Sequence, residues 1–126
     1  MNINELPFKQ TTTIYHALTF ERLKNECDRP FTKTNVAVTR KIKAMERKFQ
    51  HRVESVRKED GEPYEVNLSP DDVMFLMDML EQFKHDLLLI GEYNMKDIYY
   101  IDVIIATINV ASLIHDEERD KKYADL

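Results

Sequence analysis

The sequence contains few of the residues that cross-link a chain or turn it sharply. Its 126 residues include one cysteine, two glycines, four prolines and no tryptophan. Because Cys27 is alone, no disulfide can form within the chain. So few glycines and prolines provide too few turn signals for a many-stranded β fold, and Gly61 and Gly91 stand too far apart for a glycine-rich phosphate loop. These absences favour a helical domain without covalent cross-links.

The sequence also gives no sign of a secretory leader or a membrane span. Its first residues, MNINELPF, do not have the basic-then-apolar order of a signal peptide. Together with the single cysteine, this favours a reducing, cytoplasmic location. The longest apolar run, 98–114, is close to the minimum length for crossing a bilayer, but Asp102 and Asn109 lie inside it, where each would be costly. We therefore expect no membrane partner.

The run 98–114 is the most apolar stretch of the chain and the natural centre of a core. Its β-branched content suits a strand, but Asp102 and Asn109 are seven residues apart, which favours a helix. Most of the remaining circumference is apolar, with Tyr99, Val103, Val110 and Ile114 on one flank and Ile101, Ile104, Ile105 and Ile108 on the other. A helix with so wide an apolar arc needs neighbours on two or more sides. We expect its polar stripe to be at least partly exposed; if Asp102 were buried, a base from helix 34–58 would be its partner.

The segment 34–58 has the clearest amphipathic pattern. Its apolar residues recur at intervals of three and four, namely Val38, Ile42, Met45, Phe49, Val53 and Val56. This narrow, nearly heptad stripe predicts a long helix with one buried face, suited to pairing with another helix or a second copy.

The next segment contains the strongest local start signal. Ser69 is a helix cap, Pro70 suits the first helical position, and two aspartates follow at the positive end of the helix. We predict a helix from there to about Ile90, ended by Gly91 in a left-handed conformation. Only residues 91–94 separate it from the helix containing 98–114, so these two helices should form an antiparallel hairpin.

The N-terminal region is the hardest to interpret. Residues 2–13 have no helical stripe, and Pro7 and three successive threonines disfavour an early helix. Phe20, Leu23 and Cys27 indicate a short helix over 19–28. The fold we predict is all-α, a single domain over 1–126 that forms a small bundle of three long helices plus a short N-terminal helix. Residues 1–13 and 116–126 are its candidates for flexibility.

No constellation of residues argues for catalysis. Asp78, Glu81 and His85 share one helix face, but their spacing departs from the Glu-x-x-His pattern of di-metal bundles and has no second copy, so we interpret them as a solvated polar face. Cys27 lies between Glu26 and Asp28, which disfavours a reactive thiolate, and we interpret it as a half-buried structural residue. We expect no enzyme activity, no cofactor, no metal and no small-molecule substrate.

Charge is distributed unevenly along the chain. Residues 33–60 contain nine Lys/Arg and four Asp/Glu, although the whole chain has a net charge of −5. Four basic residues of helix 34–58 are candidates for contact with a polyanion or an acidic protein partner, namely Arg40, Arg47, Lys48 and Lys58. The alternative is that they form an ordinary charged surface in water. The segment's aromatic residue, Phe49, faces the core, which weakens the nucleic-acid interpretation.

A second candidate surface is apolar. In the helix after Ser69, two apolar residues fall among polar ones and two methionines flank them, giving the set Met74, Phe75, Met79 and Leu89. These residues would form a protein interface, or the N-terminal segment would cover them. The function we expect is a non-catalytic interaction protein (an adaptor, inhibitor or assembly subunit) that binds another protein or a second copy of itself, as a homo-oligomer through its last two helices. The alternative is a nucleic-acid-binding regulator that uses helix 34–58.

Overall fold

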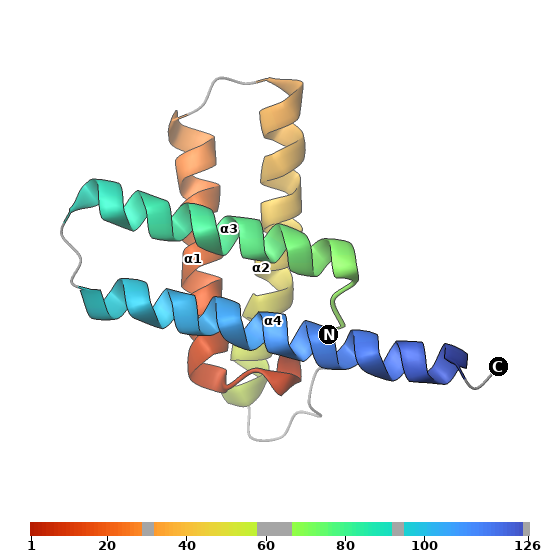
Figure 1. Cartoon of the computed structure of the whole chain (residues 1–126). Helices are drawn as coiled ribbons and strands as arrows, with labels where there is room; N and C mark the ends of the chain where they lie inside the picture. The colour runs from red at the N-terminus through yellow and green to blue at the C-terminus, as the bar shows by residue number, and fades with distance from the viewer. Residues whose placement is uncertain (29–31, 58–66, 92–94, 125–126) are drawn as a thin grey trace.

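The chain forms four long α-helices in the computed structural model, which describes residues 1–28, 32–57, 67–91 and 95–124 (Figure 1). A short 3-10 helix, η1, over Ile3–Glu5 precedes them. The α-helices are α1 (Phe8–Asp28), α2 (Lys33–Arg57), α3 (Pro70–Ile90) and α4 (Met95–Ala124). The described part contains no strand, only an isolated bridge between Asn2 and Asn67. The prediction of an all-α helical bundle is confirmed.

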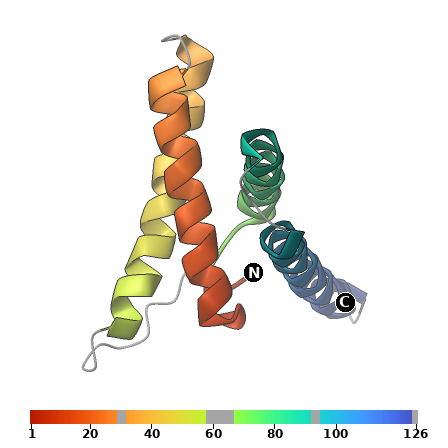
Figure 2. The ribbon, with the colours of Figure 1, turned by 90° about the vertical axis from the view of Figure 1, so that its left-hand side faces the viewer.

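The helices form two antiparallel hairpins that cross each other (Figure 1). One layer contains α1 and α2, and the other contains α3 and α4. Viewed along α3 and α4, the C-terminal part of α2 leans away from the second hairpin, with α1 between them (Figure 2). The C-terminal part of α4 extends beyond the first layer (Figure 1).

The core lies where the two layers cross. The predicted stripe of α2 provides Ile42, Met45 and Phe49, which are buried, while Val38 is partly buried. From the second layer come Leu76 and Leu80 of α3 and the isoleucines of α4. The prediction that α2 has one narrow buried face is confirmed over the described residues; the side chain of Val56 lies outside them.

Helix α1 is much longer than the sequence suggested. The prediction of a short helix over 19–28 and of no helix before residue 14 is wrong, because α1 begins at Phe8. Its threonines fit the helix by donating their hydroxyl groups to carbonyl oxygens four residues earlier, as Thr11 does to Pro7 and Thr19 to Tyr15. Such bonds satisfy the hydroxyl within the helix.

The buried face of α1 also differs from the predicted one. It contains polar residues, because Gln10, Thr11, Glu21 and Asn25 are buried beside Ile14, Ala17 and Leu18. Leu23 is instead 48% exposed, and Cys27 is exposed rather than half-buried as predicted. A stripe that mixes polar and apolar residues has almost no hydrophobic periodicity, which explains why the pattern failed here.

The predicted boundaries of α3 are confirmed. The Ser69 hydroxyl accepts a hydrogen bond from the Asp72 amide at 3.1 Å, and the Asp72 carboxylate accepts one from the Ser69 amide at 3.3 Å. This reciprocal pair is a capping box. Burial raises the pKa of Asp72, but hydrogen bonds from Lys48 and Ser69 outweigh it, so the pKa is lowered. Gly91 ends the helix with a φ of 74°, which favours glycine.

Helix α4 is less enclosed than its composition predicted. Its isoleucines Ile101, Ile104 and Ile108 are buried against the core. Two contacts with α1 add to this side: the Gln10 amide donates to the Thr107 hydroxyl at 3.3 Å, and the Lys9 ammonium lies 5.3 Å from the centre of the Tyr100 ring. The predicted neighbours on two sides are α3 and α1, but they leave part of the apolar arc uncovered, since Tyr99 and Val110 on the opposite flank are exposed.

Candidate functional site

The side of α4 that points away from the core is an exposed apolar surface. Its four large apolar side chains are more than half exposed, at 76% for Met95, 71% for Tyr99, 57% for Val110 and 62% for Leu113. We call the surface formed by Met95, Tyr99, Asp102, Ala106, Asn109, Val110 and Leu113 the outer face of α4; the three smaller or polar members are exposed too. It follows one line along the helix, because its members recur at intervals of three and four.

The polar stripe that the sequence singled out forms one edge of this face. As predicted, Asp102 and Asn109 are both exposed. The partner of Asp102 comes from α3, since the Lys84 ammonium lies 2.9 Å from its carboxylate and 3.2 Å from that of Glu81. Hydrogen bonds to Asp102 and then Glu81 raise the pKa of Lys84. Asp102 and Glu81 thus share one cation, and this cluster keeps a net charge of −1 at neutral pH. The Asn109 side-chain amide makes no hydrogen bond within the described residues.

A hollow of about 350 Å³ adjoins this edge, between α4 and the start of α3. Met74, Asn109 and Leu113 contribute to its walls, together with Met1, Pro70, Val73, Met77 and Ser112. Met74 is 66% exposed. The outer face of α4 therefore continues onto α3 at this end.

The four apolar residues of α3 that the sequence proposed as one interface do not form a single patch. Met74 and Leu89 are exposed, but fifteen residues separate them, about 22 Å along a helix. Phe75 and Met79 are half-buried and pack on the core. Part of the cover over Phe75 comes from α2, whose Lys41 ammonium lies 5.9 Å from the ring centre.

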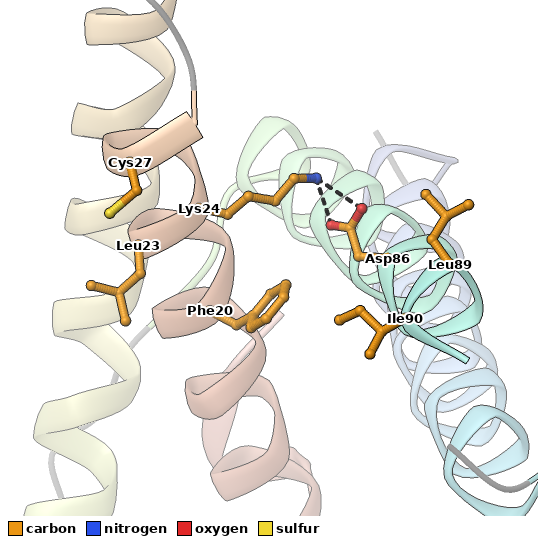
Figure 3. Close-up of a pocket in the computed structure, with 7 residues that line it drawn as sticks. All are labelled: Phe20, Leu23, Lys24, Cys27, Asp86, Leu89 and Ile90. Carbon is orange, nitrogen blue, oxygen red and sulfur yellow. Dashed lines mark hydrogen bonds and ion pairs between the residues drawn. The ribbon is translucent and has the colours of Figure 1, made fainter. Parts of the chain in front are cut away.

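Leu89 instead borders a groove between α1 and α3 of about 460 Å³ (Figure 3). Phe20, Leu23, Cys27 and Ile90 also line it. At its back the Lys24 ammonium donates to both carboxylate oxygens of Asp86, at 2.7 and 2.8 Å.

That ion pair joins the two hairpins. Burial raises the pKa of Asp86, but a hydrogen bond with the protonated form of the Glu21 carboxyl group and hydrogen bonds from Lys24 and Gln82 outweigh it, and the pKa is lowered. The two charged groups of the groove, Lys24 and Asp86, are thus engaged with each other, which is the arrangement of a structural ion pair and not of a poised acid or base.

The basic candidates of α2 have different surroundings. Arg40 and Arg47 are exposed and form no ion pair within the described residues. Lys48 is held by Asp72 at the start of α3, with 3.3 Å between the charged atoms. Lys58, the fourth candidate, lies outside the described residues. Within the described residues, the proposed basic site is therefore reduced to Arg40 and Arg47, which lie seven residues apart on one side of the helix.

Two further searches concern other classes of site. Among the residues whose side chains are described, no three His, Cys, Asp or Glu groups converge in a way that would hold a metal ion. Asp78, Glu81 and His85 are all exposed on α3. No helix in the described ranges combines the length and hydropathy needed to cross a bilayer.

The outer face of α4 is the surface that sequence reasoning missed. The apolar arc was visible in the sequence, and a homo-oligomer through the last two helices was expected, but no residue of this helix was named as part of an interface. The signal that could have separated the two faces is the repeat of seven at Tyr99, Ala106 and Leu113, which runs beside the polar pair Asp102 and Asn109. Compared with known proteins, the chain matches no family model, no curated sequence and no solved structure.

Proposed function

We propose that the protein is a non-catalytic interaction protein, an adaptor, inhibitor or assembly subunit, that binds another macromolecule through the outer face of α4. The observation that carries the proposal is the exposure of four large apolar side chains along one helix face. Contiguous apolar surface on a soluble chain marks a binding site more often than chance, and Met and Tyr are typical of interface centres. A partner's apolar surface would remove these side chains from water.

Two further observations support the proposal. The polar groups in the groove between α1 and α3 are engaged in the Lys24–Asp86 pair, which favours a structural over a catalytic role. The exposed thiol of Cys27 suits a reducing, cytoplasmic environment.

Affinity capture from the native host tests this function, with Val110→Glu as the disrupting variant. Val110 is 57% exposed, so the change places a charge on the outer face of α4 without altering the core. Ala37→Glu is the matched control, because Ala37 is exposed on α2. We expect the unaltered chain and the control to retain a protein that Val110→Glu loses. Capture of the same proteins by all three chains would contradict the proposal.

The exposure of Arg40 and Arg47 favours nucleic-acid binding as a second candidate function. Neither guanidinium is engaged in an ion pair within the described residues, so both are available to phosphates. The test is retention on heparin or duplex DNA at low salt, compared with Arg40→Glu/Arg47→Glu. Salt-dependent retention that this double variant loses would support the candidate, and no retention of the unaltered chain would contradict it.

A further inference from the structure

The outer face of α4 is nearly symmetric about its middle. Ala106 is at the centre, and Tyr99 and Leu113 lie seven residues before and after it. Seven residues are close to two helical turns, so all three project from the same side of the helix. A small residue flanked at equal distances by two large ones is a pattern that a second, oppositely directed copy of the same helix complements.

The two edges of the face have the same symmetry. On the edge beside α3, Asp102 and Asn109 lie four residues before and three residues after Ala106. On the other edge, Val103 and Val110 lie three before and four after it. In an antiparallel pair related by a two-fold axis, like edges of the two helices meet. Asp102 of one copy then lies beside Asn109 of the other, and Val103 lies beside Val110.

The two ends of the face add apolar contacts. In this register Tyr99 of one copy lies level with Leu113 of the other, at both ends of the pair. Tyr99 is 71% exposed and Leu113 is 62% exposed, so each side chain has apolar surface that the other would cover.

We propose that the outer face of α4 binds a second copy of this chain, in an antiparallel, two-fold pair centred on Ala106. This inference rests on the proposed function, because it names the partner of the same face. The matching part of each helix, from Tyr99 to Leu113, is about 21 Å long and about 10 Å wide. That strip is smaller than the roughly 800 Å² per partner of a standard interface, so the pair should dissociate on dilution.

The first test is the mass of the purified chain in light scattering over a range of concentrations. We expect a mass approaching twice the 15.0 kDa of one chain at about 100 µM, where a micromolar complex is formed. Ala106→Glu should give the mass of one chain, because two like charges would meet on the axis. Ala37→Glu should leave the double mass unchanged. A single-chain mass at every concentration would overturn the proposal, as would a double mass that Ala106→Glu preserves.

The second test addresses the register. Asn109→Lys places a cation beside Asp102 of the other copy at two symmetric sites, and Asn109→Asp places a like charge there. We expect the first to tighten and the second to weaken self-association, each by about tenfold. Both substitutions replace an exposed side chain, so the fold of the single chain and its circular dichroism spectrum should not change. Equal effects of the two variants, or none, would contradict the register.

The experiments also distinguish failure of this inference from failure of the proposed function. If the chain is a monomer and Val110→Glu still abolishes capture of a different protein, the inference fails and the proposed function stands. If the chain is a monomer and Val110→Glu loses nothing, both fail.

Discussion

Helices α2 and α4 occupy equivalent positions, each being the outer helix of its hairpin, yet they present opposite chemistry to solvent. The exposed side of α2 carries Arg40 and Arg47. The exposed side of α4 carries Met95, Tyr99, Val110 and Leu113. Charged side chains on the outer side of a helix are well solvated by water, whereas a row of exposed apolar side chains indicates a surface that binds another macromolecule. The difference is the reason for proposing α4 as the binding surface, because the narrow apolar stripe of α2 is already covered within the chain.

The comparison also explains the width of the two apolar patterns. The narrow stripe of α2 corresponds to one buried face, and that face is covered within the chain. The wide arc of α4 corresponds to two faces, one buried in the core and one exposed. A pattern of apolar residues predicts how much surface a helix needs to cover, but not whether the same chain provides the cover.

The largest effect should come from the buried faces, where the two helices are alike. Phe49 of α2 and Ile104 of α4 are both fully buried. We expect Phe49→Ala to reduce the free energy of unfolding by about 3–5 kcal/mol and Ile104→Ala by about 2–5 kcal/mol. Urea unfolding followed by circular dichroism measures both. A cost below about 1 kcal/mol for Ile104→Ala would show that α4 is not part of the core.

A smaller effect concerns the ion pair that joins the hairpins. Asp86→Asn removes the partner of Lys24, whose side chain is 24% exposed. We expect a loss of about 1–2 kcal/mol, less than for a fully buried pair. Because the folded-state pKa of Asp86 is lowered, its contribution is complete above the unfolded value of about 3.9 and is lost as the pH falls through the folded value. The difference in the free energy of unfolding between the unaltered chain and Asp86→Asn should therefore be smaller at pH 3 than at pH 6. A difference that stays constant would contradict the role of the charge.

The caps of α2 and α3 allow a direct comparison between the hairpins. The Thr32 hydroxyl accepts a hydrogen bond from the backbone N–H of Asn35 at 3.2 Å, and the Ser69 hydroxyl accepts one from the backbone N–H of Asp72 at 3.1 Å. We expect Ser69→Ala to cost about 1 kcal/mol and Thr32→Ala somewhat less, because the Ser69 cap is a reciprocal capping box at the start of a helix that also has Pro70 in its first turn. Thermal unfolding of both variants provides the test, and a larger loss for Thr32→Ala would reverse the order.

The smallest effect on stability should come from the exposed arginines. Arg40→Glu/Arg47→Glu should change the free energy of unfolding by less than about 0.5 kcal/mol, as surface substitutions usually do. Its mass in light scattering should match that of the unaltered chain, in contrast to Ala106→Glu. A loss of self-association in the arginine variant would mean that α2 belongs to the interface.

Local signals in the sequence were sufficient for much of the fold. Ser69, Pro70 and Gly91 define α3 through short-range chemistry, and the stripe of α2 defines its buried side. Helix α1 could not be found in this way, because its buried face includes the polar residues Thr11 and Glu21. Polar residues at buried positions remove the periodicity on which such predictions depend.

The candidate site was harder to predict for a different reason. The exposure of Asp102 was predicted correctly, but its partner Lys84 depends on how α3 and α4 pack side by side. Tyr99 and Val110 are as apolar as the core residues next to them in sequence. Only the position of the other helices decides which side of α4 is covered within the chain.

Oxidative cross-linking at the proposed axis tests the central claim most directly. Ala106→Cys, in a chain whose own thiol is removed by Cys27→Ser, places one cysteine of each copy at the two-fold axis. We expect mild oxidation to give a disulfide-linked pair of chains on a non-reducing gel, while Ala37→Cys in the same background stays single. Failure of position 106 to cross-link, or equal cross-linking at position 37, would contradict an antiparallel pair centred on Ala106.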